Sequence, residues 1–187
     1  MFKSIYDFSS NIESAFEIGE KILLNKNYNS INRVVIAGMG GSAIGGDVVR
    51  LLVSSSNNIP ITVSRNYNLP SWVDENSLVI CSSYSGNTEE TLSSFDDAIN
   101  KNSKIISIST GGFLKDLTNK NDLDFIKIPT GLQPRAALAF SFVPLIYLLI
   151  KIGIIGQEIL EKLKNSLPGL HKVRNLYSQD NEDNPTY

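Results

Sequence analysis

Short runs rich in Val and Ile alternate along the chain with longer segments in which apolar residues recur every three or four positions. We predict β-strands over residues 33–37, 61–64, 78–81, 104–109 and 125–128. These runs are short and largely apolar on both sides, as expected of strands that are covered on both faces. Between most of them, the helical spacing predicts helices over residues 42–54, 88–101 and 113–120.

Alternating strands and helices imply right-handed crossovers and a parallel sheet with helices on both faces. We therefore predict an α/β fold, a three-layer αβα sandwich around a five-stranded parallel sheet of flavodoxin-like order 2-1-3-4-5. Additional helices are expected over residues 10–26, 136–152 and 156–166, with a shorter helix near 169–178. We expect residues 1–30 to pack as an N-terminal helix on a domain of residues 31–178, and the polar, proline-broken residues 179–187 to form a linker or tail.

Composition limits the compartment and the classes of partner. The net charge of −2 over 187 residues offers no broad field for nucleic acid. Cys81 is the single cysteine and lies in an apolar run, which favours a buried thiol in a reducing cytoplasm. The apolar run 136–150 is too short for a membrane span, so we predict a buried helix. One histidine and one cysteine, without an acidic cluster at ligand spacing, predict no metal site.

A glycine-rich turn follows the first predicted strand, in the order Gly38-Met39-Gly40-Gly41-Ser42. It matches the dinucleotide fingerprint G-x-G-x-x-G/A through Ala43, but the second strand ends without the acidic residue that would bind a ribose. Arg65 follows that strand and keeps an NADP site open as an alternative. The other interpretation is a smaller anion, bound by the backbone at Gly40 and Gly41 and by Ser42 at a helix start.

A second turn, Ser82-Ser83-Tyr84-Ser85-Gly86-Asn87-Thr88-Glu89-Glu90-Thr91, follows the third predicted strand. Asn87 or Thr88 could simply cap the next helix, but a cap leaves most of the hydroxyl groups unexplained. In sheet order 2-1-3-4-5, strands one and three flank the switch point where α/β proteins bind ligands. We therefore predict a phosphate site formed by Gly40, Gly41, Ser42, Ser83, Ser85 and Thr88.

These two turns resemble those of the SIS (sugar isomerase) domain family, whose members bind phosphosugars through the serine- and threonine-rich turn. The segments 65–70 and 129–138, the latter reading Pro-Thr-Gly-Leu-Gln-Pro-Arg-Ala-Ala-Leu, are similar to those of the bifunctional phosphoglucose/phosphomannose isomerases. The resemblance implies isomerisation of glucose 6-phosphate and mannose 6-phosphate to fructose 6-phosphate through a cis-enediol(ate), without a cofactor.

Arg135 is the candidate catalytic residue, because a cation near the ligand could stabilise the enediolate oxyanion. The alternative is a surface arginine bound to a carbonyl or a carboxylate. The resemblance places the catalytic base in a second SIS domain that is absent here, so this chain alone is expected to lack it. Docking on that second domain or on a second copy is expected. A stand-alone module that binds or senses phosphosugars without catalysis remains the alternative function.

Overall fold

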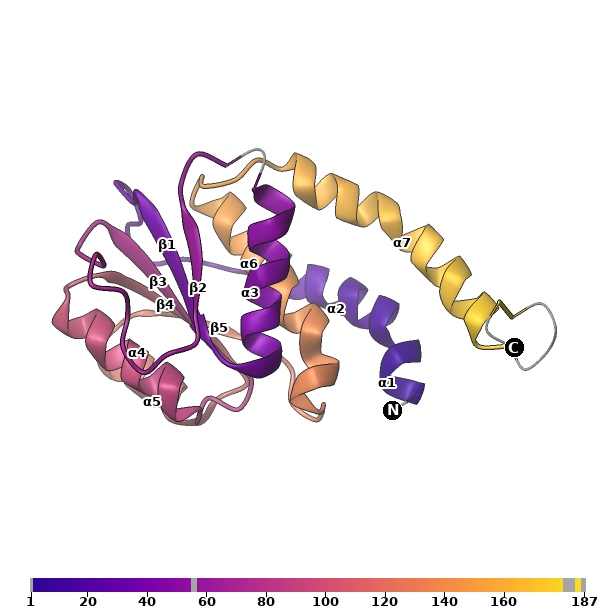
Figure 1. Cartoon of the computed structure of the whole chain (residues 1–187), viewed down its shortest axis with the longest axis horizontal. Helices are drawn as coiled ribbons and strands as arrows, with labels where there is room; N and C mark the ends of the chain where they lie inside the picture. The colour runs from indigo at the N-terminus through magenta and orange to yellow at the C-terminus, as the bar shows by residue number, and fades with distance from the viewer. Residues whose placement is uncertain (1, 55–56, 180–183, 186–187) are drawn as a thin grey trace.

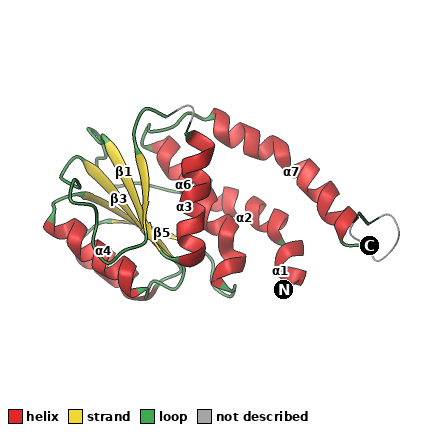
Figure 2. Cartoon of the chain, viewed as in Figure 1, coloured by secondary structure: helices red, strands yellow, loops and turns green. Residues whose placement is uncertain are grey.

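The computed structural model describes residues 2–54, 57–179 and 184–185. Five parallel strands form one sheet in the order β2-β1-β3-β4-β5, which confirms the predicted topology. The strands are β1 (Arg33–Gly38), β2 (Ile61–Ser64), β3 (Ser77–Ser83), β4 (Lys104–Ser109) and β5 (Asp124–Lys127). Helices cover both faces of the sheet, so the molecule has the three expected layers (Figures 1 and 2).

Alternate strand residues face two separate parts of the core, as the twofold period of a strand requires. Ile36 and Ile80 pack under α3 (Gly40–Val53) and α6 (Leu138–Lys151), on the same side as α2 (Phe8–Glu20). Val35, Val79 and Cys81 pack under α4 (Glu89–Asn100) and α5 (Gly112–Lys120). This two-sided burial explains why the strands carry no polar alternation.

Helix α6 accounts for the longest apolar run of the sequence. Residues 134–151 are long and apolar enough to cross a membrane, but 67% of this window is buried inside the fold. The helix packs between α2 and α3, and a Cβ on Gly45 of α3 would lie 2.5 Å from the Cβ of Ser141. Burial in the core therefore explains its hydropathy, as predicted.

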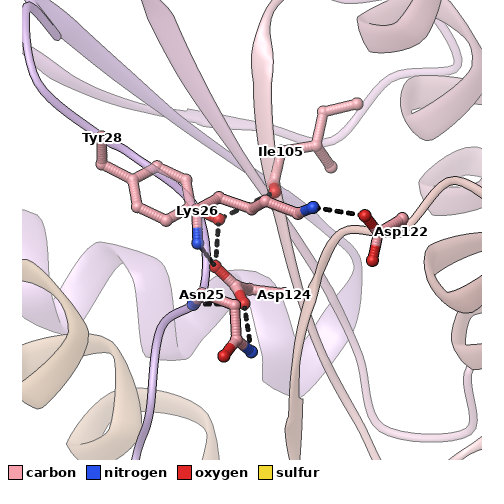
Figure 3. A network of polar contacts seen from close by, with 6 residues as sticks. All are labelled: Asn25, Lys26, Tyr28, Ile105, Asp122 and Asp124. Carbon is pink, nitrogen blue, oxygen red and sulfur yellow. Dashed lines mark hydrogen bonds and ion pairs between the residues drawn. The ribbon is translucent and has the colours of Figure 1, made fainter.

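The N-terminal helix spans Phe8–Glu20 rather than the predicted 10–26, and residues 25–28, beyond its end, bind Asp124 of β5 (Figure 3). Asp124 is 4% exposed and accepts hydrogen bonds from the Asn25 amide at 2.9 Å, the Lys26 amide at 3.1 Å and the Tyr28 hydroxyl at 2.7 Å. These backbone amides cannot also continue a helix. A short α1 (Phe2–Tyr6), which the pattern did not predict, precedes α2.

The C-terminal helices also differ from the prediction. One continuous helix, α7 (Glu158–Tyr177), replaces the two expected over 156–166 and 169–178, and it contains Pro168. Leu160, Leu163, Leu167 and Leu170 keep helical spacing across the proline and pack against the core, so their burial favours an unbroken helix. Most of the predicted tail 179–187 lies outside the described residues.

Candidate active site

The carboxyl ends of β1 and β3 bring the two predicted turns side by side. Gly38, the last residue of β1, pairs in register with Ser82 near the end of β3. A Cβ on Gly38 would lie only 2.7 Å from the Ser82 carbonyl oxygen, so glycine permits this close approach. The two turns thus share one edge of the sheet at the switch point between β1 and β3.

The first turn leads directly into α3, which begins at Gly40 rather than at the expected Ser42. Gly40 is exposed and has a φ of +51°, a left-handed conformation that favours glycine. Met39 occupies the N-cap position without a side-chain hydrogen bond, and its carbonyl accepts hydrogen bonds from the amides of Ser42 and Ala43 at 3.1 and 3.3 Å. The amides of Gly40 and Gly41 are left for a ligand or water. Ser42 is 7% exposed, and within the described residues its hydroxyl has no hydrogen-bond partner.

Hydroxyl groups brace the second turn from inside. The Ser83 Oγ lies 2.8 Å from the Thr88 Oγ1 and accepts a hydrogen bond from the Gly86 amide at 3.1 Å. The exposed Ser85 accepts one from the Asn87 amide at 3.2 Å. Thr88 stands at the N-cap of α4 but makes no capping bond, so the predicted cap role does not explain it.

Both helices that start at these turns, α3 and α4, therefore lack a side-chain cap. Their first-turn amides and dipoles favour an anion at this edge. Of the predicted phosphate residues, Gly40 and Ser85 are exposed and Thr88 is partly exposed. Gly41, Ser42 and Ser83 lie beneath the surface.

A third turn, which the sequence analysis missed, follows β4 and locks onto the second. Ser109 ends β4, and Gly111 and Gly112 follow with positive φ values. The Asn87 Oδ1 accepts a hydrogen bond from the Phe113 amide at 3.0 Å, and the Gly86 carbonyl accepts one from the Leu114 amide at 2.9 Å. Asn87 thus binds the start of α5. The repeated pattern of a hydroxyl residue and glycines after a strand was the available signal.

Arg135 lies in a 3-10 helix, Pro134–Ala137, whose backbone packs against the first turn. A Cβ on Gly41 would lie 2.7 Å from the Pro134 carbonyl oxygen and 3.7 Å from the Arg135 Cα. The Arg135 side chain is exposed, and among the described residues it has no hydrogen bond or ion pair. The alternative of an arginine bound to a carbonyl or carboxylate therefore has no support.

An apolar groove of about 1180 Å³ has Arg135 in its lining. The terminal helices and the 3-10 helix form it, and its lining includes Phe2, Ile5, Tyr6, Leu138 and Val173, with Arg174 on its wall. Phe2 and Ile5 are 66% and 69% exposed. We call this feature the terminal groove.

The other ionisable groups near the turns have partners or lie at the surface. Arg65, the candidate for a 2′-phosphate, pairs with Asp47 of α3. The Tyr67 hydroxyl donates to Glu89 at 3.4 Å, and the charge of Glu90, partial burial and the charge of Glu89 raise the pKa of Tyr67. Burial raises the pKa of the Cys81 thiol, and no described group of His, Cys, Asp and Glu could hold a metal ion.

The model of the SIS domain matches residues 27–131, which include all five strands and the three turns. The chain belongs to the SIS domain family.

Curated relatives agree with this assignment. A bifunctional phosphoglucose/phosphomannose isomerase from Caldicellulosiruptor bescii is 47% identical over 180 residues, which cover 96% of this chain and 53% of the relative. One from Thermoplasma acidophilum is 44% identical over 63% of this chain and 36% of the relative. This SIS domain chain thus spans about half the length, or less, of these relatives.

A solved structure supports the fold independently. A protein assigned as a phosphosugar isomerase from Clostridium difficile 630 superposes with a TM-score of 0.69 at 16% identity, covering 93% of this chain and 53% of that one. At this identity, the likeness concerns the fold alone. Together with the family match, it leaves the NADP-binding alternative without support.

Proposed function

We propose that this SIS domain is the phosphosugar-binding half of an aldose–ketose isomerase. It would interconvert glucose 6-phosphate, and mannose 6-phosphate, with fructose 6-phosphate. The single observation that carries the proposal is the meeting of two uncapped helix starts at one sheet edge, with hydroxyl-rich turns beside them. The names of the curated relatives supply the sugar and the reaction.

The two turns would bind the phosphate through the amides at Gly40 and Gly41 and through the hydroxyls of Ser42, Ser85 and Thr88. Ser83 would act mainly by holding Thr88 in place, because its hydroxyl is already paired with Thr88 and Gly86. A dianionic phosphate suits such a site, since the helix dipoles and free amides all favour negative charge.

Isomerisation moves a hydrogen between C1 and C2 through a cis-enediol(ate). A base removes the proton from C2 of the aldose and returns it to C1. The oxygen at C1 carries negative charge in the intermediate, and a proton passes from the C2 hydroxyl to that oxygen, which leaves the ketone at C2. Arg135, which is charged, exposed and unpaired within the described chain, would stabilise that charge. Glu89 and Glu90 stand in the first turn of α4, where a carboxylate is favoured without any catalytic role.

The base would come from the half of the relatives that this chain does not match. We propose that this half docks in the terminal groove, because the groove is apolar, is exposed and includes Arg135 in its lining. A unit seated there would bring its own residues to the open side of Arg135. Docking of a second copy of the chain is the competing outcome.

The test uses the 187-residue chain and a chimera that adds the unmatched half of the Caldicellulosiruptor bescii relative. We expect the chain alone to bind fructose 6-phosphate in calorimetry but to exchange no solvent hydrogen into C1 of that sugar. The chimera should exchange it, and Arg135→Ala in the chimera should reduce exchange far more than binding. Sedimentation of the chain alone reports whether a second copy occupies the groove.

Several outcomes would contradict the proposal. Exchange by the chain alone would place the base within it, and an unaffected Arg135→Ala chimera would remove the role of Arg135. Stabilisation by NADPH but not by hexose phosphates would overturn phosphosugar binding. A ligand at about 100 times its dissociation constant adds about 2.7 kcal/mol, which a thermal-shift assay detects. Tight binding by a folded chimera that never exchanges would favour the sensing module instead.

A further inference from the structure

Tyr84 connects the second turn to the segment that carries Arg135. It lies between Ser83 and Ser85, and its hydroxyl accepts a hydrogen bond from the Leu132 amide at 2.9 Å, across 48 positions of sequence. Leu132 precedes Arg135 by three residues, and the 3-10 helix begins two residues after Leu132. The tyrosine is partly buried, and its ring packs against the core beside the sheet.

The main chain of Tyr84 is fixed independently of its hydroxyl. Its carbonyl accepts a hydrogen bond from the Thr110 amide at 3.1 Å, which joins it to the third turn. Its neighbour Ser83 belongs to β3 and pairs in register with Ser109. The ring therefore extends from a rigid base, and the hydroxyl is a fixed acceptor for the Leu132 amide.

The segment that Tyr84 holds has few other attachments on this side. Gly131 has a φ of +93°, and a Cβ there would meet nothing within 4 Å, so this part of the loop is loosely packed. The Leu132 side chain packs against the core, and two residues later the Pro134 carbonyl oxygen lies against Gly41 of the first turn. Tyr84 and Gly41 thus contact the loop at two points, one from each predicted phosphate turn, in addition to the core packing of Leu132.

We infer that Tyr84 is a positioning residue that sets the place of Arg135 relative to the phosphate turns. The inference rests on the proposed function and deepens it, because it names how phosphate anchoring and the arginine are held in one geometry. The aromatic ring reaches the loop, while the backbone on either side of Tyr84 forms part of the second turn. Its hydroxyl is an acceptor in this contact and needs no charge.

Tyr84→Phe is the appropriate variant, since it keeps the ring and removes only the acceptor. We expect the Leu132 amide to exchange its hydrogen faster in Tyr84→Phe, with the fold retained by circular dichroism. The matched control is Tyr147→Phe in α6, which removes a hydroxyl that donates to Glu20 of α2 at 3.3 Å. It should leave Leu132 unchanged. This arm needs no ligand, so it tests the link even if the proposed function is wrong.

The second arm measures binding by calorimetry with two probes. 6-Phosphogluconate carries a phosphate and a carboxylate that stands in for the charge near Arg135, whereas inorganic phosphate occupies the phosphate turns alone. We expect Tyr84→Phe to weaken the binding of 6-phosphogluconate roughly three- to tenfold, the range expected for one lost hydrogen bond. The affinity for inorganic phosphate should change less than about twofold. In the Arg135→Ala background, Tyr84→Phe should no longer weaken the binding of 6-phosphogluconate.

Three results would overturn the inference. Unchanged exchange at Leu132 would show that the hydroxyl holds nothing. Equal weakening of both probes would show that Tyr84 acts on the phosphate turn itself. An undiminished effect in the Arg135→Ala background would show that it does not act through the arginine. A failure of the proposed function gives a different result: Arg135→Ala alone would then leave the binding of 6-phosphogluconate unchanged.

Discussion

Replacing Gly86 with alanine tests how closely the second and third turns are packed. Gly86 has a φ of +73°, and an alanine Cβ would lie 1.8 Å from the Gly111 carbonyl oxygen, a backbone atom that cannot rotate away. Gly153, at the end of α6, has a nearly equal φ of +75°, and a Cβ there would meet nothing within 4 Å. The pair therefore separates backbone strain from steric overlap.

The magnitude follows from these two contributions. A left-handed conformation costs a residue with a Cβ about 1–2 kcal/mol, and both variants bear this cost. In Gly86→Ala the two turns must also move apart, which breaks the hydrogen bonds from the Leu114 amide and from the Phe113 amide. Each is worth about 1 kcal/mol. We expect Gly86→Ala to lose about 3–4 kcal/mol of unfolding free energy and Gly153→Ala about 1–2 kcal/mol.

Urea denaturation of both variants measures the two losses, provided that the slope with denaturant stays the same. Calorimetry with fructose 6-phosphate should show weaker binding for Gly86→Ala and unchanged binding for Gly153→Ala. Equal losses of stability would refute the steric argument, because the shared backbone strain would then explain both. Unchanged binding by a destabilised Gly86→Ala would refute the place of this turn in the ligand site.

Two other substitutions test the anchors of the fold and of the arginine segment. Burial alone would raise the pKa of Asp124, but hydrogen bonds from Asn25, Tyr28 and Lys26 outweigh it and lower the pKa below 3.8. The resulting stability is present above the unfolded pKa and is lost as pH falls through the lower folded pKa. Asp124→Asn should therefore cost about 2–3 kcal/mol at neutral pH and flatten the acid limb of stability against pH, and an unchanged acid limb would contradict this. Gly41→Ala should displace the Pro134 carbonyl, because its Cβ would lie 2.7 Å from that oxygen. Fructose 6-phosphate should then bind more weakly, whereas Gly169→Ala, which meets nothing within 4 Å, should bind normally.

The sequence predicted the sheet because its signals are local. Val- and Ile-rich runs between helical segments suffice to define five parallel strands, and the turn compositions after β1 and β3 mark the edge proposed to bind the ligand. The end of α2 could not be predicted in this way. The segment after it is held by Asp124, which lies 99 positions from Asn25 and takes the Asn25 and Lys26 amides that the predicted longer helix would have used. The continuity of α7 through Pro168 likewise depends on where the leucines of both halves are buried.

The candidate site likewise contains residues that the local sequence indicates and contacts that only the fold reveals. The sequence indicates Gly40, Gly41 and Ser42 as candidates, because glycines and a hydroxyl residue between a strand and a helix are typical of an anion site, and this assignment stays a prediction. The internal role of Ser83 could not, because a hydroxyl that binds a ligand and one that braces a turn have the same sequence. Its distance of 2.8 Å from the Thr88 hydroxyl makes the difference. The packing of the Arg135 segment on Gly41 is also invisible to the sequence, since it joins residues more than 90 positions apart.

The way in which the turns and the Arg135 segment are joined affects how the proposed reaction could use binding energy. The three turns are joined to one another by backbone hydrogen bonds and by strand pairing, and together they form what we call the cradle. The Arg135 segment touches that cradle at Gly41 and at Tyr84, and its side chain is otherwise free among the described residues. In the proposed function, a phosphate held in the cradle fixes the distant C1 and C2 atoms beside the arginine. Energy gained far from the reacting carbons then lowers the barrier at them. The arginine alone cannot complete the step, because it has no proton-accepting form at neutral pH. A base brought in by a docked unit would meet a substrate that this chain has already positioned.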